Sequence, residues 1–181
     1  MALSATIHKA EIHIADMNRH YYENHHLTIA QHPSETERRL MLRILAFILN
    51  ANESLQFSKG LSTDDEPDLW VKNFSDDIEL WIDLGQPSEK RIRKACGRSK
   101  QVLIYSYGDN VSETWIKQIE NKLQRFDNLA IFHIDDISAA KIELFLKRSM
   151  NLQCNIQDAD ISISDSENIS NISIQQLYPA N

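Results

Sequence analysis

Two aspartates lie near the ends of one short stretch, residues 67–85, which has the sequence PDLWVKNFSDDIELWIDLG. Asp68 follows the proline at its start, and Asp83 lies two residues before its final glycine. Two runs of strand-forming residues around a polar turn predict an antiparallel β-ribbon. If both carboxylates lie on one face of this ribbon, they can share a divalent cation, whose shell a substrate phosphate would complete. The alternative is that one carboxylate points to solvent.

The register of this ribbon follows from a turn centred between Ser75 and Asp76. Three cross-strand pairs result: Trp70 with Trp81, Lys72 with Glu79, and Asp68 with Asp83. The first two pairs are favourable, whereas the third brings like charges together and is penalised. The same register sends Ile78, Leu80, Ile82 and Leu84 to the opposite face, where they can join a core. A slip by one residue would exchange the two faces.

A basic stretch, SEKRIRKACGRSK at residues 88–100, follows the ribbon directly. We expect a helix that Ser88 caps and Gly97 ends. Its basic residues are Lys90, Arg91, Arg93, Lys94, Arg98 and Lys100, against the single acid Glu89. A charge run of this kind is typical of a solvated helix face. It also places positive charge beside the two aspartates.

The composition is that of an ordinary globular chain. The 181 residues are 42% hydrophobic and 25% charged, and the formal net charge of −7 argues against indiscriminate phosphate binding. No apolar run has the length of a membrane span, and the N-terminus lacks the pattern of a signal peptide. Cys96 and Cys154 have no motif spacing, so neither a disulfide framework nor a zinc site is predicted. We expect one cytoplasmic domain over residues 1–181 that contacts no membrane.

The remaining elements alternate between strands and helices. Strands are expected at residues 5–15 and 21–31, and a helix follows from Ser34, whose side chain would form a capping box with Glu37. This helix carries one apolar stripe, which consists of Leu40, Met41, Ile44, Leu45 and Ile48.

The second half of the chain predicts parallel strands. Buried strands at 101–107 and 128–134 are each followed by a helix, at 110–126 and 135–148, so the two strands should lie parallel with a right-handed crossover. Alternating segments from residue 152 to 177 predict antiparallel strands. The fold class is therefore α/β, with a mixed sheet flanked by helices.

Several short blocks together resemble the bacterial YaeQ family over essentially the whole chain. They read HPSET, LQFSKGL, DDEP, WIDLG, RIRKA and IQD. Members of that family are similar to the PD-(D/E)XK nucleases. The resemblance therefore implies a restriction-endonuclease-like core with added antiparallel strands at both ends of the chain.

The resemblance also assigns a site. It implies that Asp68, Asp83 and a glutamate of the first helix bind Mg²⁺, with Glu35 preferred and Glu37 as the competitor. The motif requires a lysine at position 85, where this chain has Gly85. Lys94, or else Lys90, would supply that lysine from the following helix.

Two functions follow from the resemblance and stay open at this point. The first is Mg²⁺-dependent hydrolysis of a phosphodiester, which the retained acids favour. Arg91, Arg93, Arg98 and Lys100 would then hold the nucleic-acid backbone with a salt-dependent affinity. The second is a non-catalytic module that binds nucleic acid or a protein partner, which Gly85 and the net negative charge favour.

Overall fold

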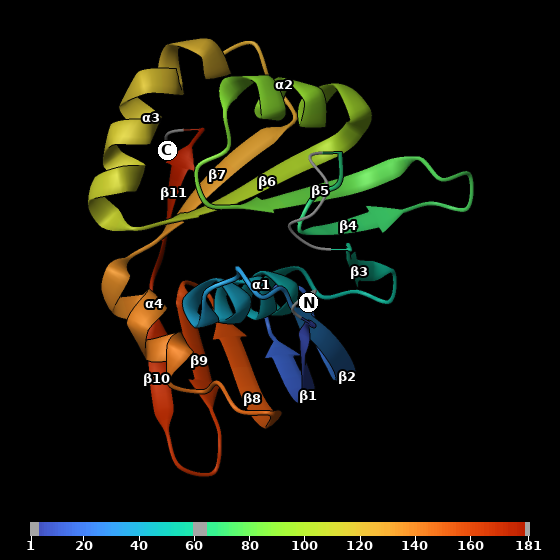
Figure 1. Cartoon of the computed structure of the whole chain (residues 1–181), viewed down its shortest axis with the longest axis vertical. Helices are drawn as coiled ribbons and strands as arrows, with labels where there is room; N and C mark the ends of the chain where they lie inside the picture. Colours follow the sequence, from blue (N-terminus) through green and yellow to red (C-terminus); the bar gives the residue numbers. More distant parts are fainter. Residues whose placement is uncertain (1–3, 60–64, 180–181) are drawn as a thin grey trace. The chain divides into compact units, whose positions relative to one another are not determined.

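The computed structural model describes residues 4–59 and 65–179 (Figure 1). The chain divides into two compact units, each of which combines two segments of the sequence. The first unit comprises Met1–Leu49 and Ile137–Ser173, and the second comprises Asn50–Asp136 and Ile174–Asn181. Each unit contains one mixed sheet. The α/β class with mixed pairing is therefore confirmed, with two sheets where the sequence predicted one.

The sheet of the first unit joins the N-terminal hairpin to most of the C-terminal strands, in the order β10-β9-β8-β1-β2. Its strands are β1 (Thr6–Asp16), β2 (Tyr21–Gln31), β8 (Ser149–Gln157), β9 (Asp160–Ser164) and β10 (Ile169–Ile172). The β1 and β8 strands pair parallel, and the other neighbours pair antiparallel. Ala10, Ile12 and Ile14 of β1 alternate into the core, as expected for a strand with one buried face.

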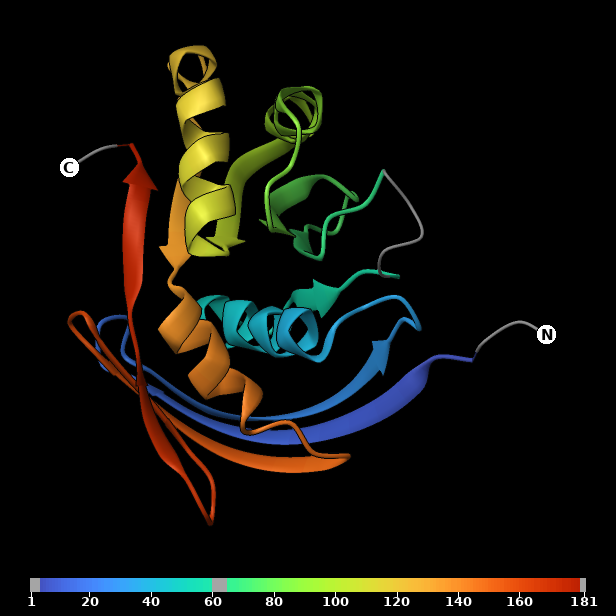
Figure 2. The same cartoon turned by 60° about the vertical axis from the view of Figure 1, so that its left-hand side comes forward.

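Two helices complete the first unit, α1 (Glu37–Asn50) and α4 (Asp136–Glu143). In Figure 2, α1 lies on the concave face of the strongly curved sheet. Every residue from Leu40 to Ile48 is buried, so the predicted stripe is confirmed but is only part of what α1 buries. A single apolar stripe predicts one buried face, so it does not show that a helix is buried on all sides.

The start of α1 differs from the prediction. The Thr36 hydroxyl accepts a hydrogen bond from the Arg39 N–H at 3.1 Å, so Thr36 is the capping residue. The predicted capping box of Ser34 and Glu37 is wrong. Ser34 instead places its hydroxyl 2.6 Å from Nδ1 of His32, within the turn that precedes the helix.

The second unit has a six-stranded sheet in the order β11-β7-β6-β5-β4-β3. Its strands are β3 (Leu55–Phe57), β4 (Leu69–Lys72), β5 (Ile78–Leu84), β6 (Ser99–Tyr107), β7 (Leu129–Ile134) and β11 (Ile174–Tyr178). The three central strands β5, β6 and β7 are parallel, which confirms the pairing predicted for β6 and β7. The last strand, β11, pairs antiparallel with β7, so the predicted C-terminal strands are divided between the two sheets.

Helices α2 (Glu89–Arg98) and α3 (Asp109–Leu123) lie over one face of this sheet (Figure 2). Ile92 of α2 and Trp115 of α3 pack into a core with Trp81 of β5. The indole N–H of Trp115 donates to the Pro87 carbonyl at 2.9 Å, which attaches α3 to the loop before α2. These contacts fix α2 against the end of β5.

The ribbon of β4 and β5 has the predicted register only at its open end. Trp70 pairs with Trp81, as predicted, but a bulge follows Val71 and pairs Lys72 with Ile78. The predicted pair of Lys72 and Glu79 is therefore wrong. The cause is a longer turn, in which the Asn73 side chain accepts hydrogen bonds from two backbone N–H groups, those of Ser75 and Asp77.

Candidate functional site

Asp83 lies near the end of β5 with only 3% of its surface exposed. Arg91, in the first turn of α2, donates from Nε to Oδ2 at 2.7 Å and from Nη2 to Oδ1 at 2.9 Å. Ser88 caps α2, as predicted, and its hydroxyl accepts a hydrogen bond from the Arg91 backbone N–H. This cap holds the Arg91 backbone in position. The result is a two-pronged, charge-assisted contact that uses both carboxylate oxygens of Asp83.

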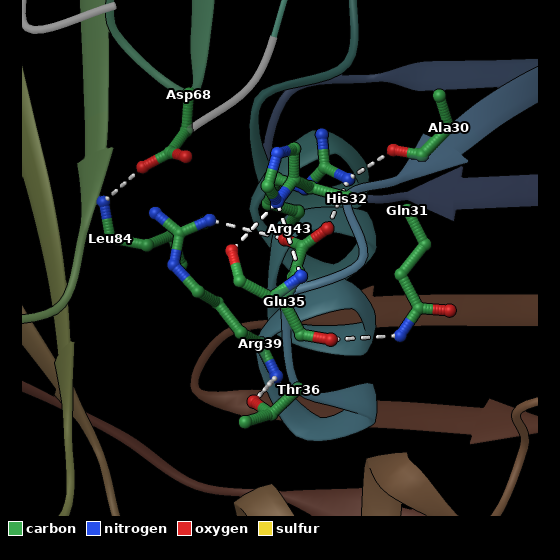
Figure 3. A network of polar contacts seen from close by, with 10 residues as sticks. Ala30, Gln31, His32, Glu35, Thr36, Arg39, Arg43, Asp68 and Leu84 are labelled. Atoms are coloured by element: carbon green, nitrogen blue, oxygen red, sulfur yellow. Dashed lines mark hydrogen bonds and ion pairs between the residues drawn. The ribbon is translucent and has the colours of Figure 1, made fainter. Parts of the chain in front are cut away.

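Asp68 is also buried, at 6% exposure, but it binds backbone groups. Its Oδ2 accepts the N–H of Leu84 at 2.8 Å (Figure 3). Its own backbone N–H donates to the Ile82 carbonyl at 2.9 Å, and its carbonyl accepts from Ser58 at 3.1 Å. Asp68 therefore joins the start of β4 to the end of β5, one residue beyond Asp83.

Three basic residues on this flank of α2 also contact the segment before β4. Arg91 donates from Nη2 to the Glu66 carbonyl at 2.9 Å, and Arg98 donates to the Asp65 carbonyl at 3.0 Å. The Lys94 ammonium forms an ion pair with the Asp65 carboxylate. This hydrogen bond and the charge of Lys94 lower the pKa of Asp65. Local sequence pattern does not indicate this role, because residues 65 and 66 are far from α2 along the chain.

The two lysines proposed for the position-85 role therefore differ in their surroundings. Lys94 contacts Asp65, and the contacts that the structure describes for Asp83 come from Arg91. Lys90 is exposed, and with Ser88, Arg91 and Lys94 it lines a pocket of about 280 Å³. Gly85 itself has a φ of +92°, a left-handed conformation that disfavours a side chain. A lysine at this position would be strained.

Glu35 lies just before α1, in the first unit, and not within that helix as expected. Its Oε1 accepts from Arg39 at 3.1 Å and its Oε2 from Arg43 at 2.8 Å, and its side chain is 1% exposed. The backbone carbonyl of Glu35 accepts from Gln31 at 3.0 Å (Figure 3). Two guanidinium groups thus share the carboxylate. Glu37, the competitor, stands in the first turn of α1.

Arg93 and Lys100 were also predicted to contact nucleic acid, and they differ in whether an acidic partner already binds them. Arg93 is exposed on α2, on the flank that faces α3, as its place in a groove with residues of that helix shows. Lys100 pairs with Glu79 at 2.8 Å, and this hydrogen bond raises the pKa of Lys100.

Asp68 and Asp83, the two acids of the second unit, are not arranged as a metal site. Over residues 4–59 and 65–179, no group of three or more His, Cys, Asp or Glu side chains could hold a metal ion. Mg²⁺ requires several oxygen ligands in near-octahedral geometry. Both oxygens of Asp83 already accept hydrogen bonds from Arg91. The donor set therefore does not fit Mg²⁺.

Comparison with known proteins identifies the family. The family model described as YaeQ protein matches residues 1–174, so the chain belongs to the YaeQ family. The YaeQ protein of Escherichia coli K12 is 45% identical over 168 residues, which cover 93% of each chain. That of Salmonella typhi is 45% identical over 175 residues, which cover 97% of this chain and 96% of the relative.

Solved structures of the family have the same fold. The crystal structure of YaeQ from Xanthomonas axonopodis pv. citri has a TM-score of 0.93 and 43% identity, covering 96% of this chain and 98% of that one. The Pseudomonas syringae YaeQ structure has a TM-score of 0.92 and 29% identity, covering 97% of both chains. No helix in the described part of this chain has the length and hydropathy needed to cross a membrane.

Proposed function

We propose that this protein is a non-catalytic variant of the PD-(D/E)XK nuclease fold that binds the backbone of nucleic acid through the surface of α2. The observation that carries the proposal is the contact of Arg91 with both oxygens of Asp83. A guanidinium carries positive charge and donates two parallel hydrogen bonds to a carboxylate. It thus meets the electrostatic need of a buried acid that a divalent cation would otherwise meet.

The surface of α2 supplies the basic groups. Lys90 and Arg93 are exposed, and the structure describes no acidic partner for either in residues 4–59 and 65–179. The chain as a whole carries a net charge of −7, so attraction to phosphate has to be local. Contacts of this kind release counterions, and the affinity then falls steeply as salt rises.

A second candidate function is Mg²⁺-dependent phosphodiester hydrolysis after Arg91 has moved away from Asp83. The hydrogen bond from Leu84 to Asp68 favours it, because this bond holds a second carboxylate beside the residue that follows Asp83. The contact of Arg91 with Asp83 argues against this function, because moving Arg91 away would leave Asp83 buried and unpaired.

Binding of a fluorescently labelled single-stranded oligonucleotide, measured by anisotropy over a range of salt concentrations, tests the proposal. Lys90→Gln should weaken binding and reduce the slope of log affinity against log salt by about one. Lys117→Gln is the matched control, because Lys117 is exposed on α3 and already paired with Glu113. Unchanged binding by the Lys90 variant would contradict the use of this surface.

The second candidate has its own test. Arg91→Ala should bind Mn²⁺ and cleave the labelled strand if only the arginine prevents metal binding. The non-catalytic proposal expects neither metal binding nor cleavage from this variant. An Arg91→Ala, Asp83→Asn double variant shows whether any activity depends on Asp83.

A further inference from the structure

A groove between α2 and α3 carries basic residues other than those of α2 that contact Asp83 and the segment before β4. It has a volume of about 650 Å³ and lies in the second unit. Its lining consists of Glu89, Arg93, Asn121, Lys122, Gln124 and Arg125. These residues are polar or charged, and three of the six are cations in a protein whose net charge is negative.

The core beneath this groove fixes the spacing of its walls. Ile92 and Ala95 of α2 belong to the same buried cluster as Ile119 and Leu123 of α3. Core packing therefore holds in place the two helices that carry the groove residues. Glu89 and Arg93 are one turn apart on α2, as positions i and i+4.

The cations of the groove are in two different states. Arg125 forms an ion pair with Glu89 across the groove. For the side chains of Arg93 and Lys122, which are both exposed, the structure shows no hydrogen bond or ion pair with any residue of 4–59 and 65–179. Two cations are thus available for a ligand, and a third is held by a carboxylate that a ligand can displace.

We propose that the α2–α3 groove binds consecutive phosphate groups of a nucleic-acid strand, an inference that rests on the proposed nucleic-acid binding. Arg93 binds a phosphate from the α2 wall and Lys122 binds the next one from the α3 wall. Arg125 exchanges Glu89 for a phosphate oxygen, while the amides of Asn121 and Gln124 donate hydrogen bonds. Guanidinium forks suit phosphate oxygens in particular.

The lining favours a phosphate backbone over other anionic ligands. It contains no aromatic side chain on which a base could stack, whereas its guanidinium, ammonium and amide groups all donate hydrogen bonds that suit phosphate oxygens. Contacts to phosphate carry no sequence information. The groove should therefore bind strands of different sequence alike.

Glu89 allows a second prediction, in which a substitution in the groove strengthens binding instead of weakening it. Neutralising a cation in the groove should weaken binding, whereas Glu89→Gln should strengthen it, because Arg125 then no longer has to exchange partners. The matched control is Glu113→Gln, which removes the same charge from α3, where Glu113 pairs with Lys117 outside the groove. A general change in net charge would affect both glutamine variants equally.

The experiment measures two ligands on the folded full-length chain: tripolyphosphate by calorimetry, and a labelled single-stranded oligonucleotide by anisotropy. Arg93→Gln and Lys122→Gln should each weaken both ligands by about threefold to tenfold, as expected for the loss of one charge-assisted contact. Glu89→Gln should tighten both by a similar factor. Lys117→Gln and Glu113→Gln should change neither by more than about twofold.

The two ligands separate the possible failures. If the oligonucleotide binds and Lys90→Gln weakens it, but its affinity is unchanged in the Arg93 and Lys122 variants, the groove is refuted while the proposed binding through α2 stands. If tripolyphosphate binds through the groove but the oligonucleotide does not bind, the nucleic-acid strand is the wrong ligand and the proposed function fails. Equal effects of Glu89→Gln and Glu113→Gln would show a net-charge effect and overturn the site.

Discussion

Arg91 donates two hydrogen bonds, at 2.7 and 2.9 Å, to the two carboxylate oxygens of Asp83. The carboxylate is almost fully buried, with 4% side-chain exposure, whereas the arginine side chain is 26% exposed. A third bond from Arg91 to the Glu66 carbonyl ties the segment before β4 to the same guanidinium. One side chain of α2 thus joins the end of β5 to the start of the ribbon.

Removal of this arginine should destabilise the fold. Arg91→Met keeps much of the side-chain volume but leaves Asp83 buried without its cation. A loss of about 2–3 kcal/mol in unfolding free energy is expected, below the range for fully buried pairs because Arg91 is partly exposed. Denaturant unfolding measures it, with Lys90→Met as the control on the exposed neighbouring position. A loss below about 0.5 kcal/mol would contradict the structural role of the pair.

The start of α1 offers a test of the corrected cap. Thr36→Ala removes the hydroxyl that accepts the Arg39 N–H, and it should cost about 1 kcal/mol of unfolding free energy. Ser34→Ala should cost clearly less, because the Ser34 hydroxyl contacts His32 and no helix N–H. Thermal or denaturant unfolding of both variants compares the two positions. A larger effect at Ser34 would restore the capping box that the sequence predicted.

The two cysteines should be poor nucleophiles. Burial, together with the charge of Asp127, raises the pKa of Cys96 to about 11. Burial alone raises the pKa of Cys154 to about 12. At pH 8 both thiols should therefore react with iodoacetamide at least about a hundredfold more slowly than a free cysteine of pKa about 8.5. Mass spectrometry of the folded and the urea-unfolded chain measures this, and rapid labelling of the folded chain would show that the prediction is wrong.

The ion pair of Asp65 and Lys94 should contribute to stability in a pH-dependent way. Its hydrogen bond and charge lower the pKa of Asp65 in the folded state. The contribution is therefore present above the ordinary pKa of 3.8 and is lost as the pH falls below that value. Asp65→Asn should be less stable than the parent near pH 6, and the difference should vanish in acid. A difference that persists at pH 2 would have another origin.

Much of the second unit could be predicted from local pattern. The apolar runs at β6 and β7 and the helices after them indicated parallel strands, because this order of elements allows few other connections. The division of the tail between two sheets could not be predicted in this way. β8 and β9 alternate in burial as a half-buried antiparallel pair would, yet β8 lies parallel to β1, about 140 residues earlier in the sequence. Periodicity shows which face of a strand is buried but not which strand lies beside it.

The residues of the candidate site were found more readily than their partners. Asp68 and Asp83 stand out by their positions on the ribbon, and both prove to be buried. In the sequence Arg91 is one basic residue among several, and its contact with Asp83 depends on how α2 packs. Asp65 and Glu66 were missed because their contacts with α2 lie 25 or more residues away along the chain. Spacing identifies candidate acids, whereas the choice between a metal and an arginine as their partner is made by packing.

The most direct test of non-catalytic binding is one titration of a labelled single-stranded oligonucleotide in millimolar Mg²⁺. Anisotropy reports binding, and denaturing electrophoresis of the same samples then reports strand length. Non-catalytic binding predicts a saturable rise in anisotropy, an affinity that falls steeply as salt increases, and a strand that stays intact throughout. Cleavage that EDTA prevents and Asp83→Asn abolishes, or no binding even at low salt, would contradict it.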